Sequence, residues 1–168
     1  MIERIHRVEG LERIRLGSGA ENHHQGICRK AGRTAGICPH FHLSLQSGCD
    51  ATLKRMNRHY TTEDYLRRCG ILREIFDHPA ITTDVIAGFP GETEEEFEET
   101  RRFLETVRFY EMHVFKYSKR QGTRAAVMED QVPEQVKARR SDVLLELEKT
   151  MSREYRGALC GQPCIGPV

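Results

Sequence analysis

The sequence predicts an α/β fold built on a parallel β-sheet, for three reasons. Along the 168 residues, segments with period-two hydrophobicity alternate with amphipathic helical segments. The segment 80–93, AITTDVIAGFPGET, begins with the apolar pattern of a strand that is buried on both faces. It then breaks at a GFPG turn, and Thr93 with Glu96 forms a capping box that starts an acidic helix.

This strand, turn and helix start place backbone N–H groups at the carboxyl edge of the sheet. Ligands bind at that edge in α/β folds. The turn is therefore a candidate ligand contact, and Glu92 within it is a candidate ligand. The alternative is an ordinary connection in which the glycines only make the turn.

Composition and charge exclude several classes of protein. With 26 Lys and Arg against 25 Asp and Glu, the net charge is +1, so any contact with nucleic acid must come from local patches. There is no apolar run of membrane-spanning length, and the first ten residues lack the apolar core of a signal peptide. Six cysteines without a secretory signal indicate reduced thiols. We therefore expect a cytoplasmic protein with no membrane contact, and nothing in the sequence indicates an oligomeric state.

The amino-terminal part predicts one short strand followed by an irregular segment. In the segment 11–18, Ile14 and Leu16 alternate with arginines, which is typical of a strand. An α/β chain normally has further sequence before such a strand, so we expect the domain to lack its amino-terminal part. The segment 19–36 shows neither periodicity and is too long for an ordinary loop. Its Cys28 and neighbouring histidines match no standard metal-ligand spacing.

A second strand and a short helix follow. Phe41, Leu43 and Leu45 alternate with polar residues, which predicts a strand that ends at 47–48. Polar side chains at such an end can reach a ligand. We interpret His40 and His42 in this strand as packing or surface residues rather than ligands. Asp50 is expected to be the N-cap of a short helix.

Two amphipathic helices are predicted over 61–76 and 93–108. Cys69 lies on the apolar face of the first, which favours a core role over a reactive one. The glutamates of 94–99 match the positive end of the dipole of the second helix, so we interpret them as a solvated face.

The carboxyl-terminal part predicts a strand, a basic loop and a long helix. After the strand 111–117, three cations surround Gly122, which favours a loop that faces phosphate; a merely soluble basic loop is the alternative. The last helix begins near Pro133 and its apolar pattern stops after Arg156. We expect the tail 157–168 to be disordered or aberrant, and its two cysteines not to be ligands.

Three blocks of sequence together resemble a known family. They are HFHLSLQSGCDATLKRMNRHYT, AITTDVIAGFPGETEEEFEET and FKYSKRQGTRAAVMEDQVPEQVK. In this order they resemble the radical-SAM tRNA methylthiotransferases, and most closely the branch that acts on N6-threonylcarbamoyladenosine beside the anticodon. The resemblance covers 11–18 and roughly 37–156.

The resemblance implies a fold and an activity. The fold is the C-terminal half of a radical-SAM partial (βα)6 barrel, with residues 1–156 as a partial core domain. The activity is transfer of a methylthio group to C2 of the tRNA nucleoside. The family uses S-adenosylmethionine and two [4Fe–4S] clusters, one of which cleaves S-adenosylmethionine to a radical while the other supplies sulfur.

The resemblance also implies site residues. The residues expected to line the S-adenosylmethionine pocket are Gln46, Ser47, Gly48, Gly88, Gly91 and Glu92. Those expected to face substrate or RNA are Lys116, Lys119, Arg120 and Arg124. No metal ligand is assigned.

The sequence departs from the family in three ways. It lacks the CxxxCxxC motif of the radical cluster, the amino-terminal domain with the second cluster's three cysteines, and the carboxyl-terminal RNA-binding β-domain. We therefore expect this chain alone to be inactive. The alternatives are a non-catalytic RNA-binding remnant of the family, another radical-SAM methylthiotransferase, and a barrel enzyme without radical chemistry, for which the sequence offers no acid–base pair.

The irregular segment 19–36 stands where the family has a helix. Codons for a typical family helix, read one base out of frame, give a sequence of this kind. Our hypothesis is a pair of compensating frameshifts around the segment, or else a real insertion. Reading the neighbouring frame of the gene decides between the two.

Overall fold

The computed structural model describes residues 8–17 and 36–160. In this part of the chain, four strands form one sheet in the order β1-β2-β3-β4, and every neighbouring pair is parallel. The strands are β1 (Ile14–Gly17), β2 (Ile37–His42), β3 (Ala80–Ala87) and β4 (Glu111–Lys116). This consecutive parallel order, with the helices on one face, is that of a half-barrel. The predicted α/β half-barrel is confirmed.

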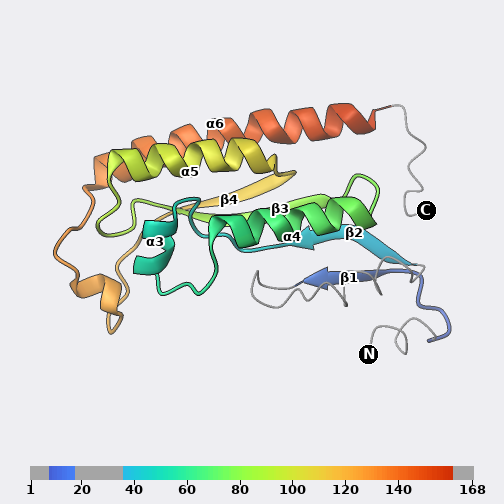
Figure 1. Cartoon of the computed structure of the whole chain (residues 1–168), viewed down its shortest axis with the longest axis horizontal. Coiled ribbons are helices and arrows are strands. Elements are labelled where there is room, and N and C mark those ends of the chain that lie inside the picture. Colours follow the sequence, from blue (N-terminus) through green and yellow to red (C-terminus); the bar gives the residue numbers. More distant parts are fainter. Residues whose placement is uncertain (1–7, 18–35, 161–168) are drawn as a thin grey trace.

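Helices lie between β2 and β3, between β3 and β4 and after β4, and they cover one face of the sheet (Figure 1). They are α3 (Asp50–Arg55), α4 (Thr62–Ile75), α5 (Glu94–Val107) and α6 (Glu134–Leu159), with a short 3-10 helix η2 (Arg124–Val127) before α6. Helix α6 packs on β3 and β4 and lies beside α5, which in turn contacts α4. None of the helices in the described ranges is long and apolar enough to cross a membrane.

The two faces of the sheet differ in polarity, as the alternation in the sequence predicts. On the helix-covered face, Phe41, Leu43 and Val85 are at most 1% exposed. The opposite face, here called the open face, carries the alternate residues, among them His42 and Asp84, which are only partly buried. Because the helices cover only one face, the polar side chains of the open face are accessible to a ligand.

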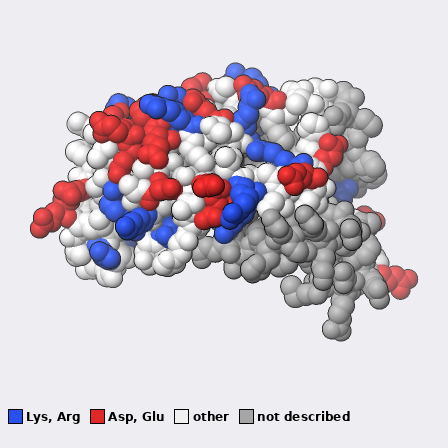
Figure 2. All heavy atoms as spheres, viewed as in Figure 1, with Lys and Arg blue, Asp and Glu red and all other residues white. Residues whose placement is uncertain are grey.

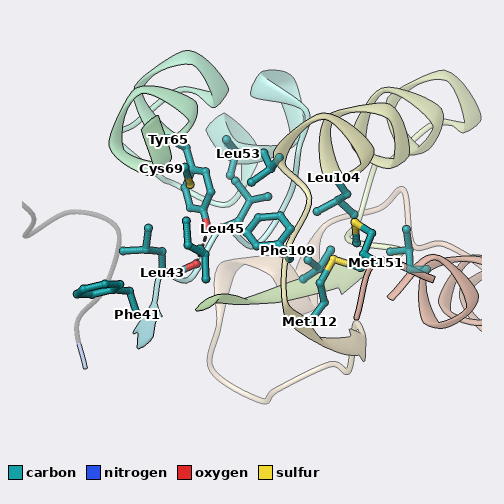
Figure 3. Packing of buried hydrophobic residues seen from close by; sticks show 14 of the residues in the cluster. Phe41, Leu43, Leu45, Leu53, Tyr65, Cys69, Leu104, Phe109, Met112 and Met151 are labelled. Atoms are coloured by element: carbon teal, nitrogen blue, oxygen red, sulfur yellow. Dashed lines mark hydrogen bonds between the residues drawn. The ribbon is translucent and has the colours of Figure 1, made fainter. Parts of the chain in front are cut away.

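The core lies between the covered face and the helices (Figure 3). Tyr65 of α4 is fully buried, and its hydroxyl donates to the carbonyl oxygen of Leu43 at 2.6 Å, drawn as a dashed line. The hydroxyl of Thr83 donates to the same carbonyl at 2.7 Å. These bonds satisfy polar groups that would otherwise be costly to bury.

The second strand ends earlier than predicted. Regular pairing of β2 stops at His42, although the chain continues along β3 to Gln46, whose N–H donates to the carbonyl of Asp84 at 2.8 Å. The cause is the side chain of Thr83, since its hydroxyl accepts from the N–H of Leu45 at 3.0 Å and takes the place of a ladder partner.

Three further boundaries differ or lie outside the described residues. The N-cap of α3 is Cys49, and Asp50 is the first helical residue; its carboxylate accepts from the N–H of Thr62 at 2.7 Å and so ties α3 to α4. Helix α6 continues past Arg156 to Leu159. The segment 18–35, with nearly all of the suspected frameshift, and the residues 161–168 of the tail lie outside the described residues.

Candidate functional site

A pocket of about 540 Å³ opens at the carboxyl ends of β2, β3 and β4. Its volume falls in the range of small-molecule sites. The residues that line it are Gln46, Arg58, Asp84, Ile86, Phe89, Phe115, Lys116, Tyr117, Ser118, Arg120, Thr123 and Ala125.

One wall of the pocket is apolar. Ile86 and Phe115 are register partners on β3 and β4, so their side chains lie next to each other on the open face. The Phe115 side chain is 54% exposed, which is unusual for a large apolar residue on a polar face. Phe89 closes this wall, with its ring held edge-on to Tyr117 at 5.3 Å between centroids. An exposed aromatic ring beside an aliphatic side chain is a suitable surface for a planar ligand.

The floor of the pocket is polar. Asp84 accepts a hydrogen bond from the hydroxyl of Ser44 at 3.0 Å and lies 3.2 Å from Nε2 of His42. Gln46 has a positive φ of 72°, an uncommon backbone conformation for a residue with a side chain. The pocket therefore offers an acidic and an amide side chain beside its apolar wall.

The sequence prediction missed Arg58, Asp84 and Phe115. A signal existed for Asp84, because it is the single charged residue in the apolar strand AITTDVIA. A charge at such a position requires polar partners or a ligand. Which side chains of β4 share its face could not be known without the register between β3 and β4.

The predicted basic residues divide into two groups. Lys116 and Arg120 line the pocket, whereas Lys119 and Arg124 are exposed outside it. Glu134 accepts from the Lys116 ammonium at 2.7 Å, and this contact raises the pKa of Lys116. Figure 2 shows acidic and basic side chains interspersed over the face viewed there, which agrees with the absence of a global charge excess. The positive charge at the pocket therefore comes from nearby residues such as Lys116 and Arg120 and not from an overall excess of basic residues.

Of the six residues expected to line a cofactor pocket, Gln46 does so. Ser47 and Gly48 lie beneath α5, where the Ser47 hydroxyl is 3.2 Å from that of Thr100. A Cβ on Gly48 would lie 2.9 Å from Cβ of Phe103, so this glycine allows α5 to approach closely. Ser47 and Gly48 support the end of the strand rather than line the pocket.

The glycine turn is held by a buried ion pair. The Glu92 carboxylate accepts from the N–H of Gly88 at 2.6 Å and from the Arg140 guanidinium at 2.9 Å. Only 1% of the Glu92 side chain and 4% of the Arg140 side chain are exposed. Burial raises the pKa of Glu92, and the nearby guanidinium opposes that shift. Gly88 and Gly91 both have positive φ, so the turn requires glycine at both positions. Glu92 therefore fastens the turn to α6.

The described residues do not supply a thiolate set for an iron–sulfur cluster. Their cysteines lie in β2, before α3, within α4 and at the end of α6, and no three of them gather in the described part of the chain. Burial raises the pKa of Cys49, and it raises that of Cys69 to about 12. Cluster ligands are thiolates, so these two cysteines are core residues. Cys28 and Cys164 lie outside the described residues.

A larger cavity, of about 750 Å³, lies at the opposite edge of the sheet. It includes the connection 73–79 into β3 together with Arg108 and Tyr155. Tyr155 donates to the carbonyl of His78 at 2.6 Å, and Arg73 donates to the carbonyl oxygens that end α5. These contacts brace a chain connection. The smaller pocket lies at the carboxyl edge, where α/β folds bind ligands, and we take it as the functional site.

Comparison with known proteins identifies the family of the chain. Residues 4–104 match the model of the Radical SAM superfamily. The chain is 41% identical to the tRNA-2-methylthio-N(6)-dimethylallyladenosine synthase of Caldicellulosiruptor saccharolyticus, over 98% of this chain and 35% of that protein. It is 47% identical to the threonylcarbamoyladenosine tRNA methylthiotransferase MtaB of Bacillus subtilis, over 89% of this chain and 33% of that protein. The chain thus spans about a third of the length of these relatives. One relative is named for dimethylallyladenosine and the other for threonylcarbamoyladenosine.

Solved structures support the fold. The coproporphyrinogen III oxidase HemN of Escherichia coli superposes with a TM-score of 0.66 at 19% identity, over 84% of this chain and 32% of that one. The radical S-adenosylmethionine methyltransferase TsrM of Kitasatospora setae gives 0.54 at 16% identity, over 68% of this chain and 22% of that one. With a parallel half-barrel, a pocket at its carboxyl edge and a family match over more than half of its length, the chain belongs to the Radical SAM superfamily.

Proposed function

We propose that this protein acts in methylthio transfer to tRNA and that its carboxyl-edge pocket binds S-adenosylmethionine. The observation that carries the proposal is the pairing of an apolar wall, Ile86 and Phe115, with the polar side chains of Gln46 and Asp84 in one pocket. The family match and the names of the relatives supply the reaction class.

The residues present fit S-adenosylmethionine. Adenine is planar and suits the exposed ring of Phe115, since base–aromatic stacking contributes roughly 1–3 kcal/mol. The ribose hydroxyls can donate hydrogen bonds to a carboxylate such as that of Asp84. The Gln46 amide can both donate and accept hydrogen bonds. When bound, S-adenosylmethionine and iron–sulfur clusters supply the radical and sulfur chemistry of this family. The side chains of this chain bind and orient the nucleoside part.

Binding of S-adenosylhomocysteine tests this proposal. We expect saturable one-to-one binding to the 168-residue chain by isothermal titration calorimetry. Phe115→Ala should weaken the binding by about tenfold, which corresponds to about 1.4 kcal/mol. The matched control is Leu145→Ala, because Leu145 is also an exposed apolar residue, at 39%, and lies on α6 away from the pocket. Equal affinity of the Phe115 variant and the control would place the ligand elsewhere.

We further propose that the substrate nucleoside is N6-threonylcarbamoyladenosine. It carries a carboxylate, whereas the dimethylallyl group is apolar. Arg58 and Arg120 line the pocket, and no ion pair joins either of them to another described residue. The proposal rests on these two cations and on the HLSLQSGCD and FKYSKRQGT segments. A non-catalytic RNA-binding role is the alternative.

Two anticodon stem-loops that differ only in this nucleoside test the substrate. We expect the threonylcarbamoyl form to bind about tenfold more tightly at low salt, because a charge-assisted hydrogen bond contributes about 1.5–3 kcal/mol. Arg120→Gln should remove most of the preference. Arg102→Gln, at an exposed position on α5, should leave it unchanged. Equal or tighter binding of the dimethylallyl form refutes this assignment.

A further inference from the structure

Three side chains of types that can ligate metals meet on the open face of the sheet. His42, Asp84 and His113 come from β2, β3 and β4, and one ligand atom of each lies within 4.8 Å of the other two. Asp84 and His113 are register partners, and Nε2 of His42 is 3.2 Å from Oδ2 of Asp84. His42 and Asp84 are 42 positions apart in the sequence, and Asp84 and His113 are 29 apart. The register of the strands brings the three residues together.

The hydrogen bonds leave the position between Nε2 of His42 and Oδ2 of Asp84 for either a proton or a metal ion. Ser44 donates its single hydroxyl hydrogen to Oδ2 of Asp84 at 3.0 Å, so it cannot also donate to Nε2 of His42, which lies 3.1 Å away. A bare imidazole nitrogen and a carboxylate oxygen repel each other, because both present lone pairs. Either a proton on Nε2 or a metal ion must therefore lie between them.

The third side chain favours a metal ion. His113 adds a second imidazole to the pair, with its ring centroid 6.1 Å from that of His42. The His113 imidazole would not stabilise a proton shared by His42 and Asp84. Two imidazoles and one carboxylate, however, form a ligand set used for Zn²⁺ and other divalent first-row ions.

The surroundings also suit a metal ion. Nδ1 of His42 lies 3.0 Å from the hydroxyl of Thr82. Metal-ligating histidines commonly make such a hydrogen bond through their second ring nitrogen, and it fixes the orientation of the ring. His113 is exposed, so a water or a ligand atom could complete the coordination from the open side.

We propose that His42, Asp84 and His113 bind a divalent first-row transition-metal ion. No thiolate takes part in the site. It lies beside the pocket, because Asp84 also lines it. The proposal does not rest on methylthio transfer, and the metal site and the nucleoside pocket can be tested separately.

Titration of the reduced, chelator-treated 168-residue chain with Co²⁺ tests the site. We expect one equivalent to bind with visible d–d absorption and without the charge-transfer band of cobalt–thiolate bonds. Zn²⁺ should displace it. His113→Ala should weaken Co²⁺ binding at least about tenfold, and this exposed side chain can be removed without loss of core packing. His59→Ala, at an exposed position outside the cluster, is the matched control.

Stability gives a second measurement. Zn²⁺ should raise the thermal midpoint of the wild-type chain and of His59→Ala, and it should not raise that of His113→Ala, because an ion that binds the folded state stabilises it. Failure of Co²⁺ to bind, a thiolate band, or equal affinity in both histidine variants would each overturn the proposal. Titration with S-adenosylhomocysteine, with and without Zn²⁺, shows whether a failure concerns the metal site or the pocket.

Discussion

Replacing Arg140 by methionine is expected to lower the free energy of unfolding by about 3–5 kcal/mol at neutral pH, as measured by denaturant unfolding. The substitution leaves the Glu92 carboxylate, 1% exposed, without its guanidinium partner. The control is Arg139→Met, because Arg139 pairs with Glu94 at the surface and is 58% exposed. Such surface pairs contribute about 0–1 kcal/mol. Similar losses in both variants would show that the Glu92–Arg140 pair does not hold the turn.

The Arg140 loss should depend on pH. Burial already raises the pKa of Glu92, and removal of the opposing guanidinium raises it further. A folded-state pKa above the unfolded one means that stability is full below the unfolded pKa and is lost as the pH rises through the folded pKa. The deficit of Arg140→Met relative to wild type should therefore shrink as the pH is lowered toward the carboxylate range. The added substitution Glu92→Gln should remove the part of this pH dependence that comes from Glu92. The part that remains comes from Glu94, which also accepts from Arg140 and whose pKa is lowered by Arg139 and by this contact.

Replacing Gly48 by alanine is expected to cost about 1–3 kcal/mol, the usual cost of overpacking. The new methyl group would lie 2.9 Å from Cβ of Phe103 and 3.0 Å from Cα of Thr100, and backbone of α5 cannot move aside as a flexible side chain can. Gly70→Ala is the matched control, since nothing lies within 4 Å of its Cβ position inside α4. It should stabilise the protein by up to about 1 kcal/mol. A neutral Gly48→Ala variant would mean that α5 does not pack against this residue.

The elements that were predicted well have local signals. The strand Ala80–Ala87 and the capping box of Thr93 and Glu96 were predicted from adjacent residues and were found there. The end of β2 was predicted wrongly, because the hydroxyl of Thr83, about forty residues later, replaces a backbone partner. Patterns within a segment do not contain such contacts.

The site was predicted less completely than the fold. Gln46, Lys116 and Arg120 were expected to face ligands and they line the pocket. Phe115 was missed because its place on the open face follows from strand register. Glu92 was expected to face a ligand, and its carboxylate is bonded to Arg140, 48 residues away. A charged residue on a helix is exposed by default, so nothing local to Arg140 indicated that it is buried.

The most direct test is a crystal structure of the 168-residue chain with S-adenosylhomocysteine. We expect the adenine to lie against Phe115 and Ile86, with the ribose toward Asp84 and Gln46, at the carboxyl edge of the sheet. The ligand in the larger cavity beside the connection 73–79, or an adenine away from Phe115, would contradict it.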